Sequence, residues 1–254
     1  LFETGHFQQL DRENHLIGMM KMNFLKRLES SIDAFAITMS NTLTKIEALM
    51  QNIRDFQTQP EESLFDSVKS EDYRIDSDGD EELEEWSVGE KLRFYFEDLS
   101  LAEWLQDLEQ DRLKIAALLK EAKAITPSRD NKLQRLKALI QQKITQPSTN
   151  RLGQPVRKVL VFTAFADTAK YLYQQLHEWA KQTGGVESAL VTGSEVRTTM
   201  EKLKGKVHFE MVLTHFSPRS KEWNKGGKEI DLLIATDCIS EGQNLQDADY
   251  LINY

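Results

Sequence analysis

The chain has 254 residues, 40% of them hydrophobic, a formal net charge of −9 and one cysteine, Cys238. This length allows one large domain or two small ones. A single cysteine excludes an internal disulfide framework and a cysteine-based zinc site, and it favours a reducing, cytoplasmic compartment. No apolar run approaches the roughly 20 residues of a membrane span, and no secretory signal pattern is present, so we expect no contact with a membrane.

The acidic charge is concentrated in one segment. Residues 61–111 carry 19 acidic and 4 basic side chains, whereas residues 112–150 carry 9 basic and 2 acidic ones. A phosphate backbone can therefore find positive surface despite the negative total. The charge pattern permits nucleic acid as a partner without demanding it.

The first third of the chain has the periodicity of a helix. Residues 25–56 carry apolar side chains at alternating spacings of three and four, which predicts a helix of roughly nine turns with one continuous apolar seam. Such a helix needs an antiparallel partner, and the pattern from about Leu92 to Ala124 is the candidate. The predicted seam comprises Leu25, Leu28, Ile32, Phe35, Met39, Thr42, Ile46, Leu49, Ile53 and Phe56, and the partner seam Leu105, Leu108, Leu113, Ala116 and Leu119.

An acidic insertion separates these two helical patterns. Residues 57–90 are rich in Asp, Glu and Ser, which predicts a flexible loop. Its Asp76-to-Asp80 stretch suggests calcium at first sight. An EF-hand loop needs glycine at its sixth position and a glutamate at its twelfth. Here Gly79 is fourth and Ser87 is twelfth, so we expect no calcium site.

A third helix is predicted after residues 126–128. Asp130 or Asn131 suits its N-cap, and its apolar stripe is followed by a polar linker at residues 146–155. The stripe comprises Leu133, Leu136, Leu139, Ile140 and Ile144.

Beyond the linker the pattern changes to short apolar strands alternating with helices. Strands are predicted at residues 158–162, 188–192 and 230–236, with a fourth beginning at Tyr250. Helices are predicted between them, one capped by Asp167 and ended by Gly184 and Gly185, the others at residues 196–204 and 207–216. This alternation is typical of an α/β domain with a parallel sheet and right-handed crossovers. We expect a helical region at residues 1–127 and the α/β domain at residues 128–254.

Three of the predicted strands end in small and hydroxylated residues. These ends are Thr163 to Phe165, Thr192 to Ser194, and Thr236 to Gly242. The carboxyl ends of parallel strands are where α/β sheets bind ligands, and helix N-termini nearby favour phosphate. Hydroxyl donors contact phosphate without reading base identity. The three ends together predict a phosphate-rich ligand.

Other chemistries fail their sequence tests. No dinucleotide fingerprint, Walker A loop or nucleophile elbow occurs. His208 and His215 lie seven residues apart on a predicted helix without a cysteine nearby, so we expect no metal site.

The second half of the chain resembles the second RecA-like lobe of Swi/Snf-type superfamily-two ATPases. Residues 159–172 (VLVFTAFADTAKYL) resemble motif IV, and residues 231–249 (DLLIATDCISEGQNLQDAD) resemble motif V. Residues 214–221 (THFSPRSK) are similar to the bacterial RapA-like, or HepA-like, branch. Residues 130–136 resemble the helix that leads into this lobe, and residues 26–31 the helical region ahead of it. The implied fold is a RecA-like three-layer domain preceded by an all-α helical hairpin region.

The resemblance assigns roles to individual positions. Thr163, Ser194 and Thr236, with their neighbours Phe165 and Gly193, fall where family members contact the DNA or RNA backbone. A second group, Glu241, Gly242 and Asn244, falls where motif V faces the nucleotide. In such enzymes ATP and Mg²⁺ bind between two RecA-like lobes.

The departures from the family pattern concern the ATPase site. The first lobe with its Walker A lysine is absent, and the chain ends at Tyr254, before motif VI with its arginine finger. Loss of an arginine finger costs about three to five powers of ten in rate. We therefore expect a fragment that contains no complete catalytic site, binds no ATP or Mg²⁺ stably, and has no ATPase activity alone.

Two interpretations remain open at this stage. One is a piece of an ATP-driven DNA or RNA translocase or helicase; its first residue, Leu1, and its end within a strand pattern favour this. The other is a non-catalytic module that binds protein or nucleic acid through a degenerate lobe. The helical hairpin could act as a wedge, contact a partner such as RNA polymerase, or brace the lobe, and bracing is the preferred role.

Overall fold

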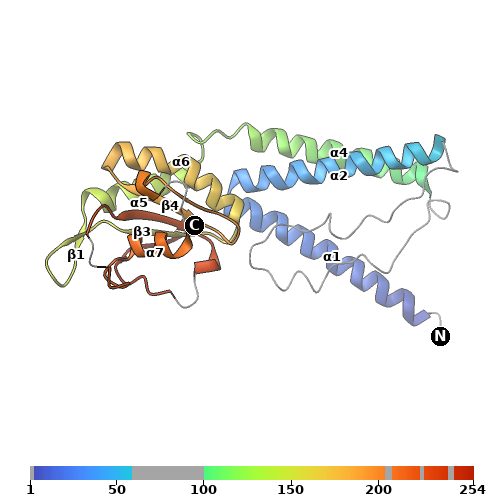
Figure 1. Cartoon of the computed structure of the whole chain (residues 1–254). Coiled ribbons are helices and arrows are strands. Elements are labelled where there is room, and N and C mark those ends of the chain that lie inside the picture. The colour runs from blue at the N-terminus through green and yellow to red at the C-terminus, as the bar shows by residue number, and fades with distance from the viewer. Residues whose placement is uncertain (1–2, 59–99, 204–207, 224–225, 240–242) are drawn as a thin grey trace.

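The computed structural model describes residues 3–58, 100–203, 208–223, 226–239 and 243–254. An elongated helical region extends away from one end of an α/β lobe (Figure 1). The acidic insertion lies outside the described residues, apart from its start at Gln57 and Thr58, which end a helix. The helices are α1 (Glu3–Ser30), α2 (Ile32–Thr58), α4 (Leu101–Lys123), α5 (Asn131–Thr145), α6 (Ala166–Gly184) and α7 (Phe209–Phe216).

Helices α2 and α4 form the predicted antiparallel hairpin. Near the lobe, Phe35 and Met39 of α2 pack with Leu119 and Ala122 of α4. Farther out, Arg112 of α4 lies 3.9 Å from a carboxylate of α2, so the two helices run in opposite directions. The prediction of Leu113 as a seam residue of α4 is wrong, because this side chain is 56% exposed. Ile115 instead packs against the cluster of Phe35, Met39, Leu119 and Ala122. The 3.6-residue period places a seam only to within a neighbouring position.

The predicted continuous helix from Leu25 to Phe56 is also wrong at its start, because the chain changes direction at Ser31 (Figure 1). The Ser31 hydroxyl accepts a hydrogen bond from the Ala34 amide at 3.0 Å, which is the geometry of a new helix N-terminus. Leu25 and Leu28 consequently lie on α1, where they are 59% and 44% exposed.

The lobe contains a five-stranded sheet of order β5-β4-β6-β3-β7. Neighbouring strands are parallel except β4 and β5, which are antiparallel, so the sheet is mixed and mostly parallel. The fold class is therefore confirmed as α/β, with helices ahead of it. The strands are β3 (Val159–Phe162), β4 (Glu187–Val191), β5 (Val196–Thr198), β6 (Ile230–Ala235) and β7 (Leu251–Asn253).

The helix predicted at residues 196–204 is not formed. Residues 196–198 are β5, and Glu201–Leu203 form one 3-10 turn. Two adjacent threonines fasten this segment to β4: the Thr198 hydroxyl donates to the Ser188 carbonyl at 3.0 Å, and the Thr199 hydroxyl accepts from the Ser188 amide at 2.8 Å. Pairing with β4 thus overrides the local helical pattern. The expected polar linker likewise contains a small antiparallel hairpin, β1 (Ser148–Thr149) and β2 (Pro155–Val156).

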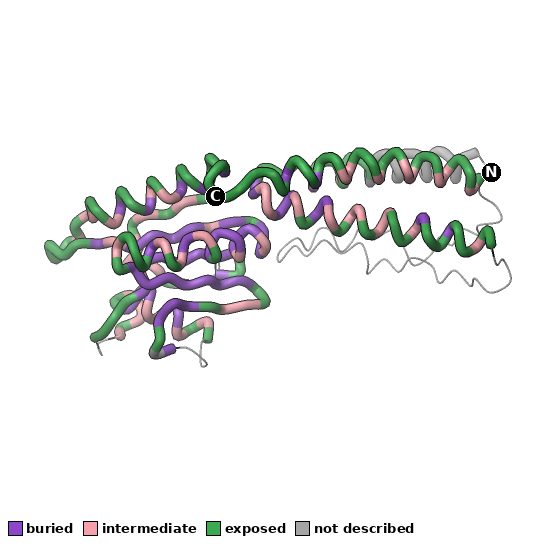
Figure 2. The backbone as a smooth tube through the Cα atoms, turned by 90° about the horizontal axis from the view of Figure 1, so that it is seen from above, coloured by how far each residue is buried: buried purple, intermediate pink, exposed green. Residues whose placement is uncertain are grey.

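The core lies in two layers, one on each face of the sheet. Helices α5 and α6 cover one face, and α7 with residues 245 and 248 covers the other. Buried backbone runs through the lobe from end to end in Figure 2, whereas burial in the helical region is confined to one side of each helix. Along β3, Val159 and Val161 face the first layer and Leu160 the second, as expected for a strand covered on both faces.

The ends of the lobe helices follow the expected chemistry with one exception. Asp130 caps α5 by accepting the Leu133 amide at 3.0 Å, and Gly185 ends α6 in a left-handed conformation with φ of 63°. Asp167, predicted as a cap, is instead the second residue of α6, and Phe165 occupies the cap position. The Asp167 carboxylate pairs with Arg27 of α1.

Candidate nucleic-acid interface

The three predicted strand ends lie side by side at the carboxyl edge of the sheet. Val191, Ala235 and Phe162 are partners across β4, β6 and β3, so the residues that follow them are aligned as well. Two backbone hydrogen bonds continue this alignment past the strands. The Thr163 amide donates to the Ala235 carbonyl at 3.1 Å, and the Thr236 amide to the Val191 carbonyl at 3.1 Å. The sheet therefore brings together the ends that the sequence singled out.

The turn after β4 is one exposed part of this row, and Ala164, Asp237 and Cys238 of the other two strand ends are exposed as well. Gly193 and Ser194 are exposed, and the Thr192 hydroxyl holds the turn by accepting the Glu195 amide at 3.0 Å. The acidic side chain of Glu195 pairs with Arg197 and lies 4.0 Å from Lys170. The turn thus exposes Ser194, and its neighbour Glu195 holds two cations, Arg197 and Lys170, with one carboxylate. Thr192 belongs to the predicted strand end, but its role in holding the turn was not predicted, although its spacing to Glu195 is that of a local side-chain turn.

Two further hydroxyls of the row, on Thr163 and Thr236, are buried. Thr163 is 2% exposed and Thr236 is fully buried. The Thr163 hydroxyl accepts the Phe165 amide at 3.4 Å, and the Thr236 hydroxyl donates to the Cys238 sulfur at 3.4 Å. In this conformation both threonines hold their own loops, so neither hydroxyl faces outward to a phosphate.

Phe165 lies in the junction between the lobe and the helical region. Its ring is buried beneath the guanidinium of Arg27, whose central carbon is 4.8 Å from the ring centre. This is a cation–π arrangement. The aromatic face that could stack on a base is therefore occupied by a residue of α1, a contact that the sequence alone did not indicate.

The motif V segment contains both described and undescribed positions. Glu241 and Gly242 lie outside the described residues, and Asn244 is exposed. The segment is held from the side by the turn after α7, because Asp247 accepts the amides of Arg219 and Ser220 at 2.8 and 3.1 Å. Residues 243–246 line an open hollow on the surface. The exposed amide of Asn244 can donate to a phosphate and accept from a ribose hydroxyl.

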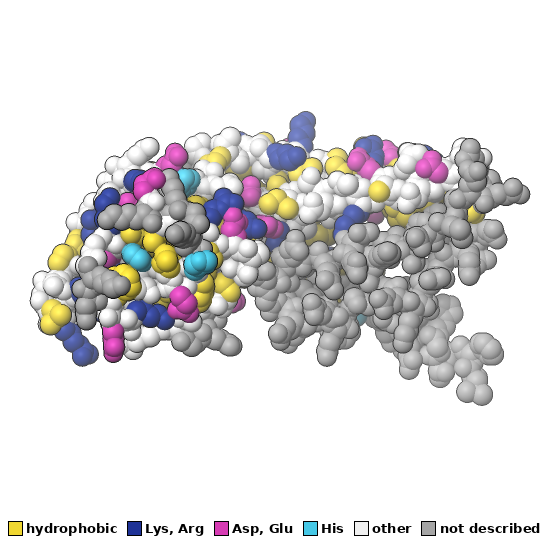
Figure 3. All heavy atoms as spheres, viewed as in Figure 1, with side chains coloured by type: hydrophobic (Ala, Val, Ile, Leu, Met, Phe, Trp, Pro, Cys, Tyr) yellow, Lys and Arg dark blue, Asp and Glu magenta, His cyan; other side chains and the backbone are white. Residues whose placement is uncertain are grey.

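One face of the lobe carries mixed charge. On the face seen in Figure 3, basic and acidic side chains alternate along the lobe, and hydrophobic and histidine side chains gather near its centre. Binding to a backbone would therefore rely on local donors at the sheet edge more than on a broad basic stripe.

The structure describes one of the three positions expected to face a nucleotide, Asn244. Within the ranges given above, no three His, Cys, Asp or Glu side chains gather as candidate ligands of a metal ion. Asn244 fits contact with a nucleotide, but this part of the chain supplies no set of oxygen ligands for Mg²⁺. The structure also contains, over the same residues, no helix that combines the length and apolar character required to cross a membrane.

Comparison with known proteins locates the similarity in the same half of the chain. Residues 131–254 match the family of the helicase conserved C-terminal domain. The match supports a helicase superfamily-two C-terminal lobe. It begins at the first residue of α5 and covers every strand of the five-stranded sheet. No curated protein matches the chain.

Proposed function

We propose that this chain is part of an ATP-dependent DNA or RNA translocase or helicase of the Swi/Snf type, RapA-like branch, in which it binds the nucleic-acid backbone and supplies the second wall of the ATP site. The observation that carries this proposal is the aligned row of strand ends on a lobe that matches the helicase C-terminal domain. A row of donors at one sheet edge can contact consecutive phosphates of a strand without reading its bases.

The nucleotide would bind on the side of the motif V segment. Asn244 and the turn that holds Asp247 would pass changes at the nucleotide to Thr236, which lies in the same segment. The binding site for ATP and Mg²⁺ would be completed by a first lobe with its own phosphate-binding loop. A cytoplasmic location is part of this proposal, and the single cysteine supports it.

Binding of the chain to nucleic acid tests the first part of the proposal. Fluorescence anisotropy with labelled single-stranded and double-stranded DNA, and with RNA, should give an affinity that falls as salt rises. Ser194→Glu places a carboxylate at the exposed turn and should weaken binding by about tenfold, since like charge opposes the phosphate. Thr44→Glu, at an exposed position of α2 far from the edge, is the matched control and should have no effect. Equal effects of the two changes would contradict the proposed edge.

The second part of the proposal concerns turnover. In a protein containing both lobes, alanine at Thr163, Ser194 and Thr236 should reduce the DNA-stimulated ATPase rate and leave the basal rate in place. Equal loss of both rates would contradict a role in nucleic-acid contact.

A second candidate is a non-catalytic module that binds nucleic acid or a protein such as RNA polymerase. The burial of Thr163, Thr236 and Phe165 favours it, because these positions of the expected row are closed to a strand. Sequencing of the parent reading frame distinguishes the two, because only the motor requires a Walker A loop before this segment and an arginine-rich motif VI after it.

A further inference from the structure

Arg27 is a buried cation at the meeting point of three helices. It lies in the last turn of α1 and is 3% exposed. Its Nε donates to the Thr38 hydroxyl at 2.9 Å, and its Nη2 donates to the Ala34 carbonyl at 3.4 Å and pairs with Asp167. The guanidinium also covers the ring of Phe165. One side chain of the helical region therefore contacts α2 and the start of α6.

This arrangement is specific to arginine. A guanidinium is planar, so it can stack on an aromatic ring while its edge donates to several acceptors. The C-terminus of α1 favours a cation here, whereas the N-terminus of α6 opposes one, and the Asp167 carboxylate in the first turn of α6 offsets that opposition. Removing the guanidinium would leave a partly buried carboxylate without its cation and a phenylalanine ring without its cover.

The contact lies directly after a proposed nucleic-acid position. Phe165 and Asp167 are two and four residues beyond Thr163, and they flank the first residue of α6. Two further bonds join the same places: the hydroxyls of Ser30 and Ser31 lie 2.8 and 3.0 Å from that of Thr168. The α1–α2 corner thus fixes where α6 begins, and with it the loop that follows β3.

We propose that Arg27 is a positioning residue for nucleic-acid binding, through which the helical region sets the loop of residues 163–165. This inference rests on the proposed function of that loop. Arg27 touches no phosphate itself; it acts through the Phe165 ring and the Asp167 carboxylate. The helical hairpin then has a task beyond bracing, because any change in its angle to the lobe alters the strand-binding edge.

The test compares Arg27→Met, Arg27→Lys and Phe165→Leu in the whole chain, with Arg112→Met as the matched control. Within the described residues, the ion pairs of Arg112 are with Glu109 of α4 and Glu47 of α2, not with the lobe. Labelled single-stranded DNA is titrated at several salt concentrations, and stoichiometric titration gives the active fraction, so that partial unfolding is separated from weaker binding. Hydrogen exchange is followed at the Ala169 amide, which donates to the Phe165 carbonyl at 3.0 Å.

Arg27→Met and Phe165→Leu should each raise the dissociation constant by about fivefold and speed exchange at Ala169, with an unchanged active fraction. Arg27→Lys should recover part of the affinity, and Arg112→Met should behave as the parent. The slope of log affinity against log salt should be the same in the Arg27 variants as in the parent. If Arg27 contacted a phosphate directly, its replacement by methionine would reduce the size of that slope by about one.

The outcomes separate the two proposals. A parent chain that does not bind DNA or RNA overturns the proposed function and this inference with it. Normal binding by Arg27→Met overturns the inference alone, and so does a reduced salt slope, which would make Arg27 a direct contact.

Discussion

The Tyr171 hydroxyl of α6 donates a hydrogen bond to Asp130 Oδ2 at 2.9 Å, while Asp130 Oδ1 accepts the Leu133 amide that begins α5. One carboxylate therefore caps one helix and receives a buried hydroxyl from the next. Burial and the bond to Asp130 both raise the pKa of Tyr171 well above its usual range. The two helices that cover one face of the sheet are tied at this point.

Asp130→Ala should lower the free energy of unfolding by about 2 to 4 kcal/mol, because it removes the cap and leaves the Tyr171 hydroxyl unpaired. Asp130→Asn keeps an oxygen that can cap the helix, so it should lower the free energy of unfolding by less. Tyr171→Phe should lower it by about 1 kcal/mol. Urea denaturation followed by circular dichroism measures all three, and equal losses for the alanine and asparagine variants would contradict the capping role.

A second prediction concerns pH and the α1–α2 corner. Burial, and then the nearby Asp167 carboxylate, raise the pKa of Asp33 above its usual value. A raised pKa in the folded state means that the protonated form adds stability, which is complete below the pKa of the unfolded chain and is lost as pH rises through the folded pKa. Asp33→Asn should therefore raise the melting temperature at pH 7 and have little effect near pH 3. Thermal scans at both pH values test this, and a variant that is less stable at pH 7 would contradict it.

Two glycines should respond to alanine with opposite signs. Gly185 has φ of 63°, where a side chain is strained, so Gly185→Ala should lower the free energy of unfolding by about 1 to 2 kcal/mol. Gly18 lies within α1 with open space around an added methyl group, so Gly18→Ala should raise helix stability by up to about 1 kcal/mol. Denaturant unfolding of the two variants measures both changes in the free energy of unfolding. A Gly185→Ala variant as stable as the parent would be inconsistent with the left-handed end of α6.

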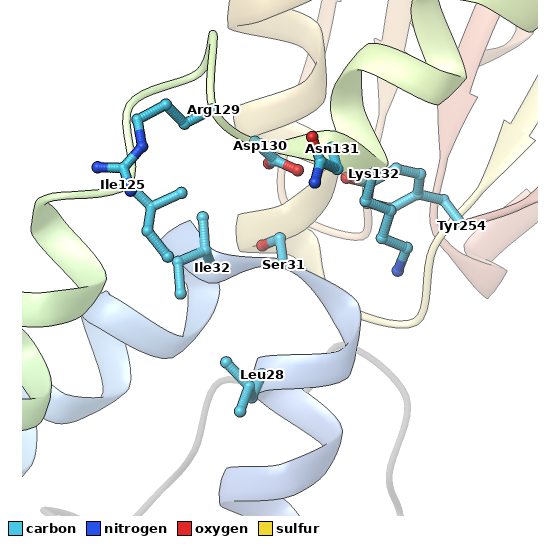
Figure 4. A pocket seen from close by; sticks show the side chains of 9 residues that line it. All are labelled: Leu28, Ser31, Ile32, Ile125, Arg129, Asp130, Asn131, Lys132 and Tyr254. Carbon is cyan, nitrogen blue, oxygen red and sulfur yellow. The ribbon is translucent and has the colours of Figure 1, made fainter.

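Lys132 joins α5 to the end of α1. Its ammonium donates to the carbonyls of Glu29 and Ser30 at 2.7 and 2.9 Å and lies 4.1 Å from the centre of the Tyr254 ring. It lines the hollow at the junction together with Leu28, Ile32 and Ile125, as Figure 4 shows. Lys132→Met should cost about 1 kcal/mol, discounted for the partial exposure of the ammonium. The variant should also show faster hydrogen exchange of the backbone amides in the last turn of α1. An unchanged exchange rate there would contradict the role of Lys132 in joining α5 to α1.

The sequence predicted those elements whose signals are local and strong. Strands such as Ile230–Ala235 are nearly continuous apolar runs, and the ends of α5 and α6 contain residues whose chemistry favours a cap or a left-handed turn. It failed where a distant contact overrides a local pattern. Residues 196–198 form a strand because β4 is available for pairing, and Ser31 starts a new helix at a corner that rests on Thr168.

The candidate site shows the same division. The alignment of the strand ends follows from parallel pairing and could be predicted from the order of strands and helices. The burial of Thr163 and Thr236 and the cover over Phe165 could not, because each depends on the way a loop folds back or on a residue of α1. Periodicity within a segment carries no information about such contacts. The roles of these residues in binding stay a prediction.

The junction joins residues that are far apart along the chain: Arg27 and Asp167 are separated by 140 positions, and Ser30 and Thr168 by 138. Closing so long a loop is entropically costly before any contact rewards it. The lobe has a layered core of its own, and the corner has only a few polar bonds to it. The corner should therefore dock late in folding and open early in unfolding, which makes it the place where the two regions of the molecule separate under load.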